Sequence, residues 1–64
     1  MRGNLTREVI QTVIDAGTDG ITSRGVVDVL EAVDIPGTPA AIRSILSRAR
    51  YAGALTYDGV YRAK

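Results

Sequence analysis

The sequence has no cysteine and no histidine, and its aromatic residues are three tyrosines. Without cysteine no disulfide can stabilise the fold, and without cysteine and histidine an ordinary zinc site is excluded. Catalytic triads and dyads that use histidine or cysteine are excluded for the same reason. No apolar run approaches the ~20 residues of a membrane-spanning helix, so we expect neither a metal nor a membrane as a partner.

Other features of enzymes and exported proteins are also lacking. The chain has no glycine-rich phosphate loop at the required spacing. Asp28 and Glu31 are three residues apart on an expected helix, but an exposed helix face explains them more simply than a catalytic pair. We therefore expect no enzyme and no cofactor. No apolar signal-peptide core follows residues 1–4, which favours an intracellular protein.

Charge is distributed unevenly along the chain. Residues 1–37 carry three basic and six acidic side chains, whereas residues 38–64 carry five basic and one acidic. The formal net charge of +1 is small, but the asymmetry indicates an anionic partner for the C-terminal half. Chance clustering of a few charges is the alternative.

Two helices are expected in the first half of a single domain. Apolar residues recur every three or four positions over residues 5–16, with Thr6 as a candidate N-cap. A second helix is expected over residues 24–33, capped by Thr22 or Ser23. Its inward-facing residues are expected to be Val26, Val27, Leu30 and Val33.

The segments that flank the second helix are short. Ile21–Thr22 has room only for a single strand bridge. Pro36 pushes Ile35 out of the helical conformation, and Gly37 permits a positive φ, so residues 34–37 are expected to separate the second helix from the third.

The third helix and the segment after it carry the most informative pattern. Thr38 is a candidate N-cap, Pro39 suits the first helical position, and Gly53 ends the helix. Asp58-Gly59 between two strand-like segments predicts a two-residue type I′ hairpin, which must pack on the helices to be stable. The apolar face of the helix contains Ile42, Ile45, Leu46, Ala49 and Ala52. The opposite arc contains Ala40, Arg43, Ser44, Ser47, Arg50 and Tyr51, with Arg48 on its flank.

Two segments carry a resemblance to a known family. Gly20–Ser23 precedes the second helix, and Arg48–Leu55 passes from basic residues through glycine to an apolar pair as it leaves the third. Together with the apolar stripe of the third helix, they resemble the winged helix-turn-helix family, in particular small phage and excisionase-like regulators. The resemblance covers residues 5–63 of a single domain, residues 1–64. It implies a mainly α fold of three helices with a two- or three-stranded wing sheet, here with a minimal wing turn at Asp58-Gly59 and no additional dimerisation helix.

The exposed face of the third helix is the candidate DNA-binding surface, because a helix fits the major groove and reads base edges from its exposed face. Arg43 and Ser44 are candidates for base contacts, whereas Arg48 and Arg50 suit flanking phosphates. The full set of candidates is Arg43, Ser44, Ser47, Arg48, Arg50, Tyr51 and Arg62.

Each candidate also has a simpler structural explanation. Arg43 can be a solvated charge, Tyr51 can cover the edge of the domain, and Arg62 can protect an edge strand from pairing. Ser23 and Arg24 begin the second helix, where the helix dipole favours a phosphate. N-capping by Ser23 explains that position more simply than a phosphate contact does.

The sequence thus predicts sequence-specific binding to double-stranded DNA by a small transcriptional or recombination regulator. The third helix is expected in the major groove and the hairpin wing on the adjacent backbone, with self-association left open. The alternative is a winged-helix module that docks a partner protein. Such a surface should expose large apolar side chains, and only Tyr51 and Tyr57 qualify.

Overall fold

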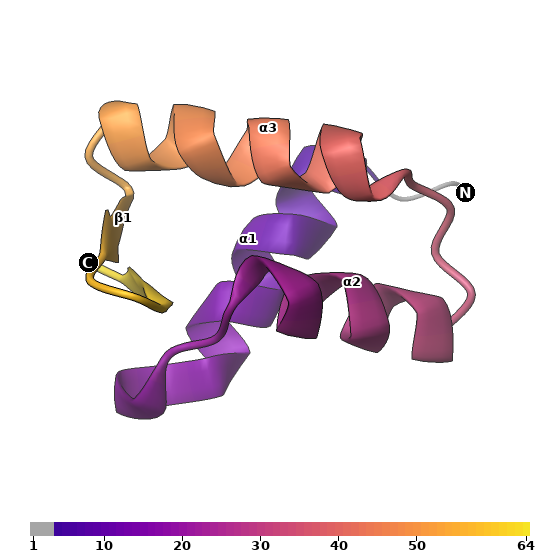
Figure 1. Ribbon diagram of the computed structural model, residues 1–64, viewed down its shortest axis with the longest axis horizontal. Helices are drawn as coiled ribbons and strands as arrows, with labels where there is room; N and C mark the ends of the chain where they lie inside the picture. The colour runs from indigo at the N-terminus through magenta and orange to yellow at the C-terminus, as the bar shows by residue number, and fades with distance from the viewer. Residues whose placement is uncertain (1–3) are drawn as a thin grey trace.

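The computed structural model describes residues 4–64, which form three helices followed by an antiparallel hairpin (Figure 1). The elements are α1 (Leu5–Ala16), the 3-10 turn η1 (Gly17–Asp19), α2 (Ser23–Ala32), α3 (Pro39–Tyr51), β1 (Leu55–Tyr57) and β2 (Tyr61–Ala63). This is the predicted mainly α class with a small hairpin, and the order of elements is compatible with a winged helix-turn-helix layout. Within the described part of the chain, no helix combines the length and apolar character needed to cross a membrane.

The second and third helices begin at the caps that the sequence predicts. The Thr22 hydroxyl accepts a hydrogen bond of 3.0 Å from the backbone N–H of Gly25. The Thr38 hydroxyl accepts one of 3.1 Å from the N–H of Ala41. Each bond satisfies one of the backbone donors that the first turn of a helix leaves unpaired.

Helix α1 has the predicted bounds but a different cap. Asn4 takes the N-cap position, and its side chain accepts a hydrogen bond from the N–H of Arg7. The prediction of Thr6 as the cap is wrong, because the helix already includes Leu5 and the cap must precede the first helical residue. Thr6 lies instead in the first turn, exposed to solvent.

Helix α2 ends in a turn that uses a non-glycine residue. Asp34 has a φ of 58°. Its N–H donates to the carbonyl of Glu31, and the N–H of Ile35 donates to the carbonyl of Leu30 at 2.9 Å. This pair of bonds is a Schellman motif, accompanied by the packing of Ile35 against the core. The positive φ that Gly37 would permit is therefore found at Asp34 instead, whose short polar side chain tolerates it.

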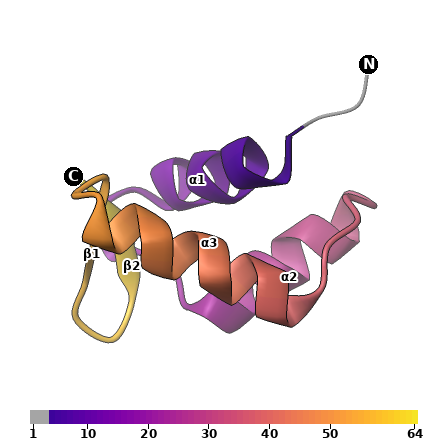
Figure 2. The same cartoon turned by 90° about the horizontal axis from the view of Figure 1, so that it is seen from above.

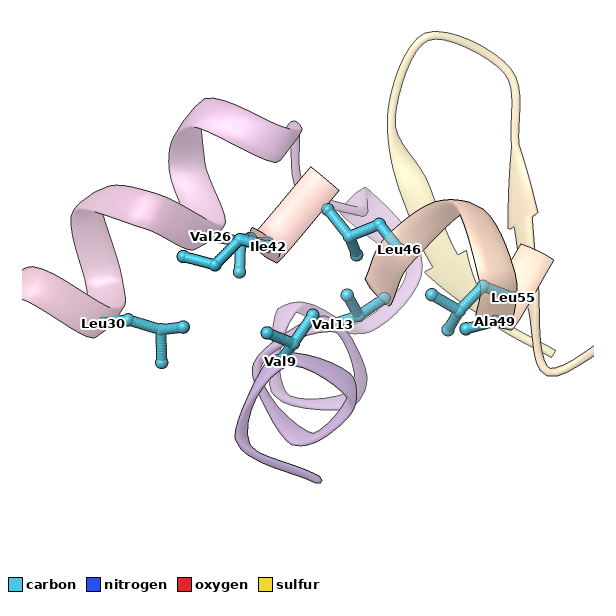
Figure 3. Packing of buried hydrophobic residues seen from close by; sticks show 8 residues of the cluster. All are labelled: Val9, Val13, Val26, Leu30, Ile42, Leu46, Ala49 and Leu55. Atoms are coloured by element: carbon cyan, nitrogen blue, oxygen red, sulfur yellow. The ribbon is translucent and has the colours of Figure 1, made fainter. Parts of the chain in front are cut away.

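The core lies where the three helices and β1 meet (Figure 3). Helix α1 packs behind α2 and α3, and the hairpin lies beneath the C-terminal end of α3 (Figures 1 and 2). Val33, expected to point inward, is 59% exposed because α2 ends at Ala32 and the chain turns away from the core. The buried residues are Val9, Val13, Val26, Leu30, Ile42, Leu46, Ala49 and Leu55.

The hairpin has a longer loop than the sequence predicts. Tyr57 pairs with Tyr61, so the loop contains the three residues 58–60, and the expected two-residue turn is wrong. A type I′ turn requires a positive φ at both central residues, whereas Asp58 has none. The register is set elsewhere: Tyr61 bridges Ile21 through two backbone hydrogen bonds of 2.9 and 2.7 Å. This contact is the single strand bridge that the sequence predicts.

Gly20 allows the hairpin to approach the helices closely. A Cβ atom there would lie 2.6 Å from Cγ2 of Val60 and 2.9 Å from the carbonyl oxygen of Tyr61. Gly17 has a similar backbone conformation, with a φ of 68° against 75° at Gly20, but a Cβ atom there would have no neighbour within 4 Å. The two positions therefore separate backbone strain from steric contact.

We predict that Gly20→Ala lowers the free energy of unfolding more than Gly17→Ala. Backbone strain should cost each variant about 1–3 kcal/mol, and overpacking should cost Gly20→Ala roughly another 1–3 kcal/mol. Urea denaturation followed by circular dichroism measures both losses. Equal losses would contradict the close approach of the hairpin at Gly20.

Candidate nucleic-acid interface

The exposed face of α3 consists of two rows of side chains. Positions three and four apart on a helix lie next to each other, which places the candidates in the rows Arg43–Ser47–Arg50 and Ser44–Arg48–Tyr51. Ser47 is half-buried and the other five are exposed. The stripe of Ile42, Leu46 and Ala49 on the opposite side is buried in the core and holds this face outward. Six of the predicted site residues thus share one surface, which we call the α3 surface.

The arginines of the α3 surface form no ion pair in the part of the chain that the structure describes. Residues 38–57 contain three arginines and no acidic residue. Within residues 4–64 the only ion pair within 4 Å joins Arg62 and Asp58, so Arg43, Arg48 and Arg50 have no carboxylate partner there. Arg48 and Arg50 also lie in the last turn, where cations complement the helix dipole.

The end of α3 brings the hairpin next to the arginines. Gly53 has a φ of 86° and donates to the carbonyl of Arg50 at 3.1 Å. Ala54 donates to the carbonyl of Ala49 at 2.9 Å, which completes a second Schellman motif. The turn directs the chain from α3 into β1, so that Leu55 enters the core two residues later.

Tyr57 connects the hairpin to the α3 surface. The guanidinium carbon of Arg50 lies 5.2 Å from the centre of the Tyr57 ring. The Tyr57 ring in turn lies 4.6 Å from that of Tyr61, at an angle of 46°. Tyr61 packs against the core, whereas Tyr57 is 44% exposed. Sequence reasoning did not place Tyr57 beside Arg50, because the contact depends on the hairpin register and not on spacing within α3.

Arg62 lies apart from the α3 surface. It pairs with Thr56 and so projects from the face of the hairpin opposite to Tyr57. Its Nε donates to the backbone carbonyl of Thr18 at 2.7 Å, and its Nη1 donates to the carboxylate of Asp58. Arg62 therefore ties the hairpin to η1, and the wing-turn residue Asp58 neutralises its charge.

A groove between α2 and α3 brings two other predicted residues to Arg43. The groove has a volume of about 320 Å³. Its lining consists of Ser23, Arg24, Val27, Asp28, Glu31, Pro39 and Arg43. Because Thr22 is the N-cap of α2, Ser23 is the first helical residue and does not cap the helix. The groove also contains two carboxylates, those of Asp28 and Glu31, which the sequence did not associate with the site.

We predict that Tyr57 orders the Arg50 side chain. An exposed cation–π contact contributes about 0.5–1 kcal/mol, and the ring current of Tyr57 should shift the Arg50 side-chain protons upfield. In NMR spectra, Tyr57→Leu should abolish this shift and Tyr57→Phe should keep it. Tyr51→Leu, a change at an 89% exposed tyrosine, is the control. An unchanged Arg50 spectrum in Tyr57→Leu would contradict the contact.

A relative of known function would indicate what the α3 surface and the neighbouring groove bind. No family model, curated protein or solved structure matches the chain. Function is therefore inferred from the charge, exposure and contacts of these residues.

Proposed function

We propose that the protein binds double-stranded DNA in a sequence-specific manner through α3, as a small transcriptional or recombination regulator of the winged-helix type. One observation carries the proposal: within residues 4–64, three exposed arginines with no carboxylate within 4 Å lie on one face of a helix, together with the small side chains of Ser44 and Ser47. The major groove, about 12 Å wide, admits an α-helix. Ser44 and Ser47 leave room for close approach to the base edges.

The position of each arginine suggests its role. Arg43 lies in the second turn of α3 beside Ser44, and it is suited to a bidentate contact with guanine O6 and N7. Arg48 and Arg50 lie about one and a half and two turns later, on opposite flanks of the exposed face, where they suit phosphates on the two sides of the groove. Arg24 borders the same groove as Arg43 and adds a positive charge on α2, beside the carboxylates of Asp28 and Glu31.

The hairpin contributes to this surface mainly by positioning Arg50. Arg62 would reach a phosphate only by giving up its contacts with Thr18 and Asp58. The carboxylate of Asp58 at the loop also repels phosphate. The wing would therefore rest beside the DNA backbone and support Arg50 through Tyr57.

A single copy should bind weakly. One small module buries roughly 600–1,000 Å² of protein surface on DNA, so useful specificity calls for a second copy or adjacent sites. The proposed regulator would act in the cytoplasm of a bacterial or phage-infected cell, without catalysis and without a cofactor.

A second candidate function, docking of a partner protein, is favoured by an apolar feature on α2. Val29 and Val33 lie one turn apart and are 42% and 59% exposed. Exposed apolar side chains of this kind suit a protein interface. They lie outside the α3 surface, so docking there is compatible with DNA binding.

Binding to DNA is tested by fluorescence anisotropy with mixed-sequence duplex at two salt concentrations. We expect affinity to fall steeply with salt, with a slope of about −0.9 in log K against log salt for each phosphate contacted. No binding at low salt would reject the proposal and favour protein docking.

We predict that Arg43→Ala weakens binding to a duplex selected from a random pool by roughly 5- to 150-fold and relaxes the preference for guanine, because a bidentate arginine–guanine contact contributes about 1–3 kcal/mol. Arg48→Ala should instead weaken binding to all duplexes alike and reduce the salt slope by about one unit. Arg7→Ala, an equal charge change at an exposed position on α1, is the control. A loss in Arg43→Ala no larger than in Arg7→Ala would contradict the role of Arg43.

A further inference from the structure

We infer that Asp28 and Glu31 are specificity-determining residues of the proposed DNA interface: they repel the phosphate backbone beside α3 and so lower the affinity for duplex of arbitrary sequence. The inference rests on the proposed DNA binding and adds to it. It assigns a function to the two carboxylates that lie among the arginines.

The first observation is the position of the two carboxylates. Asp28 and Glu31 line the same groove as Arg24 and Arg43, and both are exposed. Asp28 follows Arg24 by four residues and Glu31 follows Asp28 by three, which places them on one side of α2. Neither carboxylate lies within 4 Å of a basic side chain in the part of the chain that the structure describes.

The second observation is the contrast with the α3 surface. Residues 38–57 contain no acidic residue, whereas the groove holds two carboxylates for two arginines. Helix α2 borders the N-terminal half of α3, and the hairpin borders its C-terminal end (Figures 1 and 2). A DNA strand that runs along α3 therefore passes Arg50, which contacts Tyr57, at the C-terminal end of the helix. At the N-terminal half it passes the mixed-charge groove between α2 and α3.

The negative charges of Asp28 and Glu31 affect contacts with phosphates more than contacts with bases. Binding to arbitrary DNA depends almost entirely on phosphate neutralisation. A carboxylate closer to a phosphate than the Debye length, about 10 Å at 0.1 M salt, opposes that binding. On duplex of arbitrary sequence Arg43 would bind a phosphate beside the carboxylates, whereas guanine would draw Arg43 onto the base edge and leave fewer phosphate contacts for the carboxylates to oppose. Asp28 and Glu31 should therefore raise the ratio of specific to non-specific affinity.

The test replaces each carboxylate by its neutral amide. Asp28→Asn and Glu31→Gln should each raise the affinity for mixed-sequence duplex, roughly threefold to tenfold at about 0.1 M salt. The gain for the selected duplex should be smaller, so that the specificity ratio falls. The matched control is Asp15→Asn on α1, on the other side of α2, where the amide oxygen can still accept the hydrogen bond from Gln11.

The control should change affinity less than twofold at about 0.1 M salt, because Asp15 lies on the side of α2 away from the groove and its charge is screened more strongly there. Circular dichroism of each variant confirms the helical content. The inference is overturned if Asp28→Asn and Glu31→Gln match Asp15→Asn, if they weaken binding, or if both duplexes gain equally. These results would leave DNA binding by the wild-type protein intact, whereas a wild-type protein that binds no duplex rejects the proposed function itself.

Discussion

The two hydrogen bonds between Ile21 and Tyr61 join the hairpin to the segment before α2, and the contact of Tyr57 with Arg50 at the candidate site depends on them. A hairpin with three residues in each strand is not stable alone in water. The bridge holds Tyr61 against the helical core, Tyr61 supports the ring of Tyr57, and Tyr57 lies beneath Arg50. The position of the Arg50 side chain thus depends on main-chain hydrogen bonds made by Ile21, which precedes α2 in the sequence.

All three helices contribute apolar side chains to the small core, but they carry charges of different sign on their outer faces. Buried valine, leucine and isoleucine side chains from all three helices meet at the centre. Helices α1 and α2 turn most of the acidic residues outward, whereas α3 turns arginines and serines outward. Because α3 packs on both other helices through a single apolar stripe, its polar face remains free for a partner.

The parts of the fold that follow from local chemistry could be predicted from the sequence. Helix α3 has a threonine cap, proline at its first position, a regular apolar stripe and a glycine after its end, and all of these are found. Its exposed face followed from the same periodicity, which is why six candidate residues share one surface. The hairpin loop could not be predicted, because its register is fixed by contact with Ile21, far away in the sequence.

The same limit applies to contacts between elements at the candidate site. The position of Arg62 against Thr18 and the entry of Asp28 into the groove with Arg43 depend on how the elements pack. Asp34 shows a different limit. Residue preferences favour glycine at a positive φ, but at the end of α2 the N–H groups of Asp34 and Ile35 bond the last carbonyls of the helix, and this places the positive φ at Asp34.

The positions of the three tyrosines allow the hairpin end of the protein and the helical core to be followed by different spectroscopic signals. The chain has no tryptophan and no phenylalanine, and its tyrosines lie at the end of α3 and in the hairpin. Near-ultraviolet absorption and intrinsic fluorescence therefore report on that end of the molecule alone, while far-ultraviolet dichroism reports mainly on the helices. Detachment of the hairpin can thus be distinguished from unfolding of the helical core without any added label.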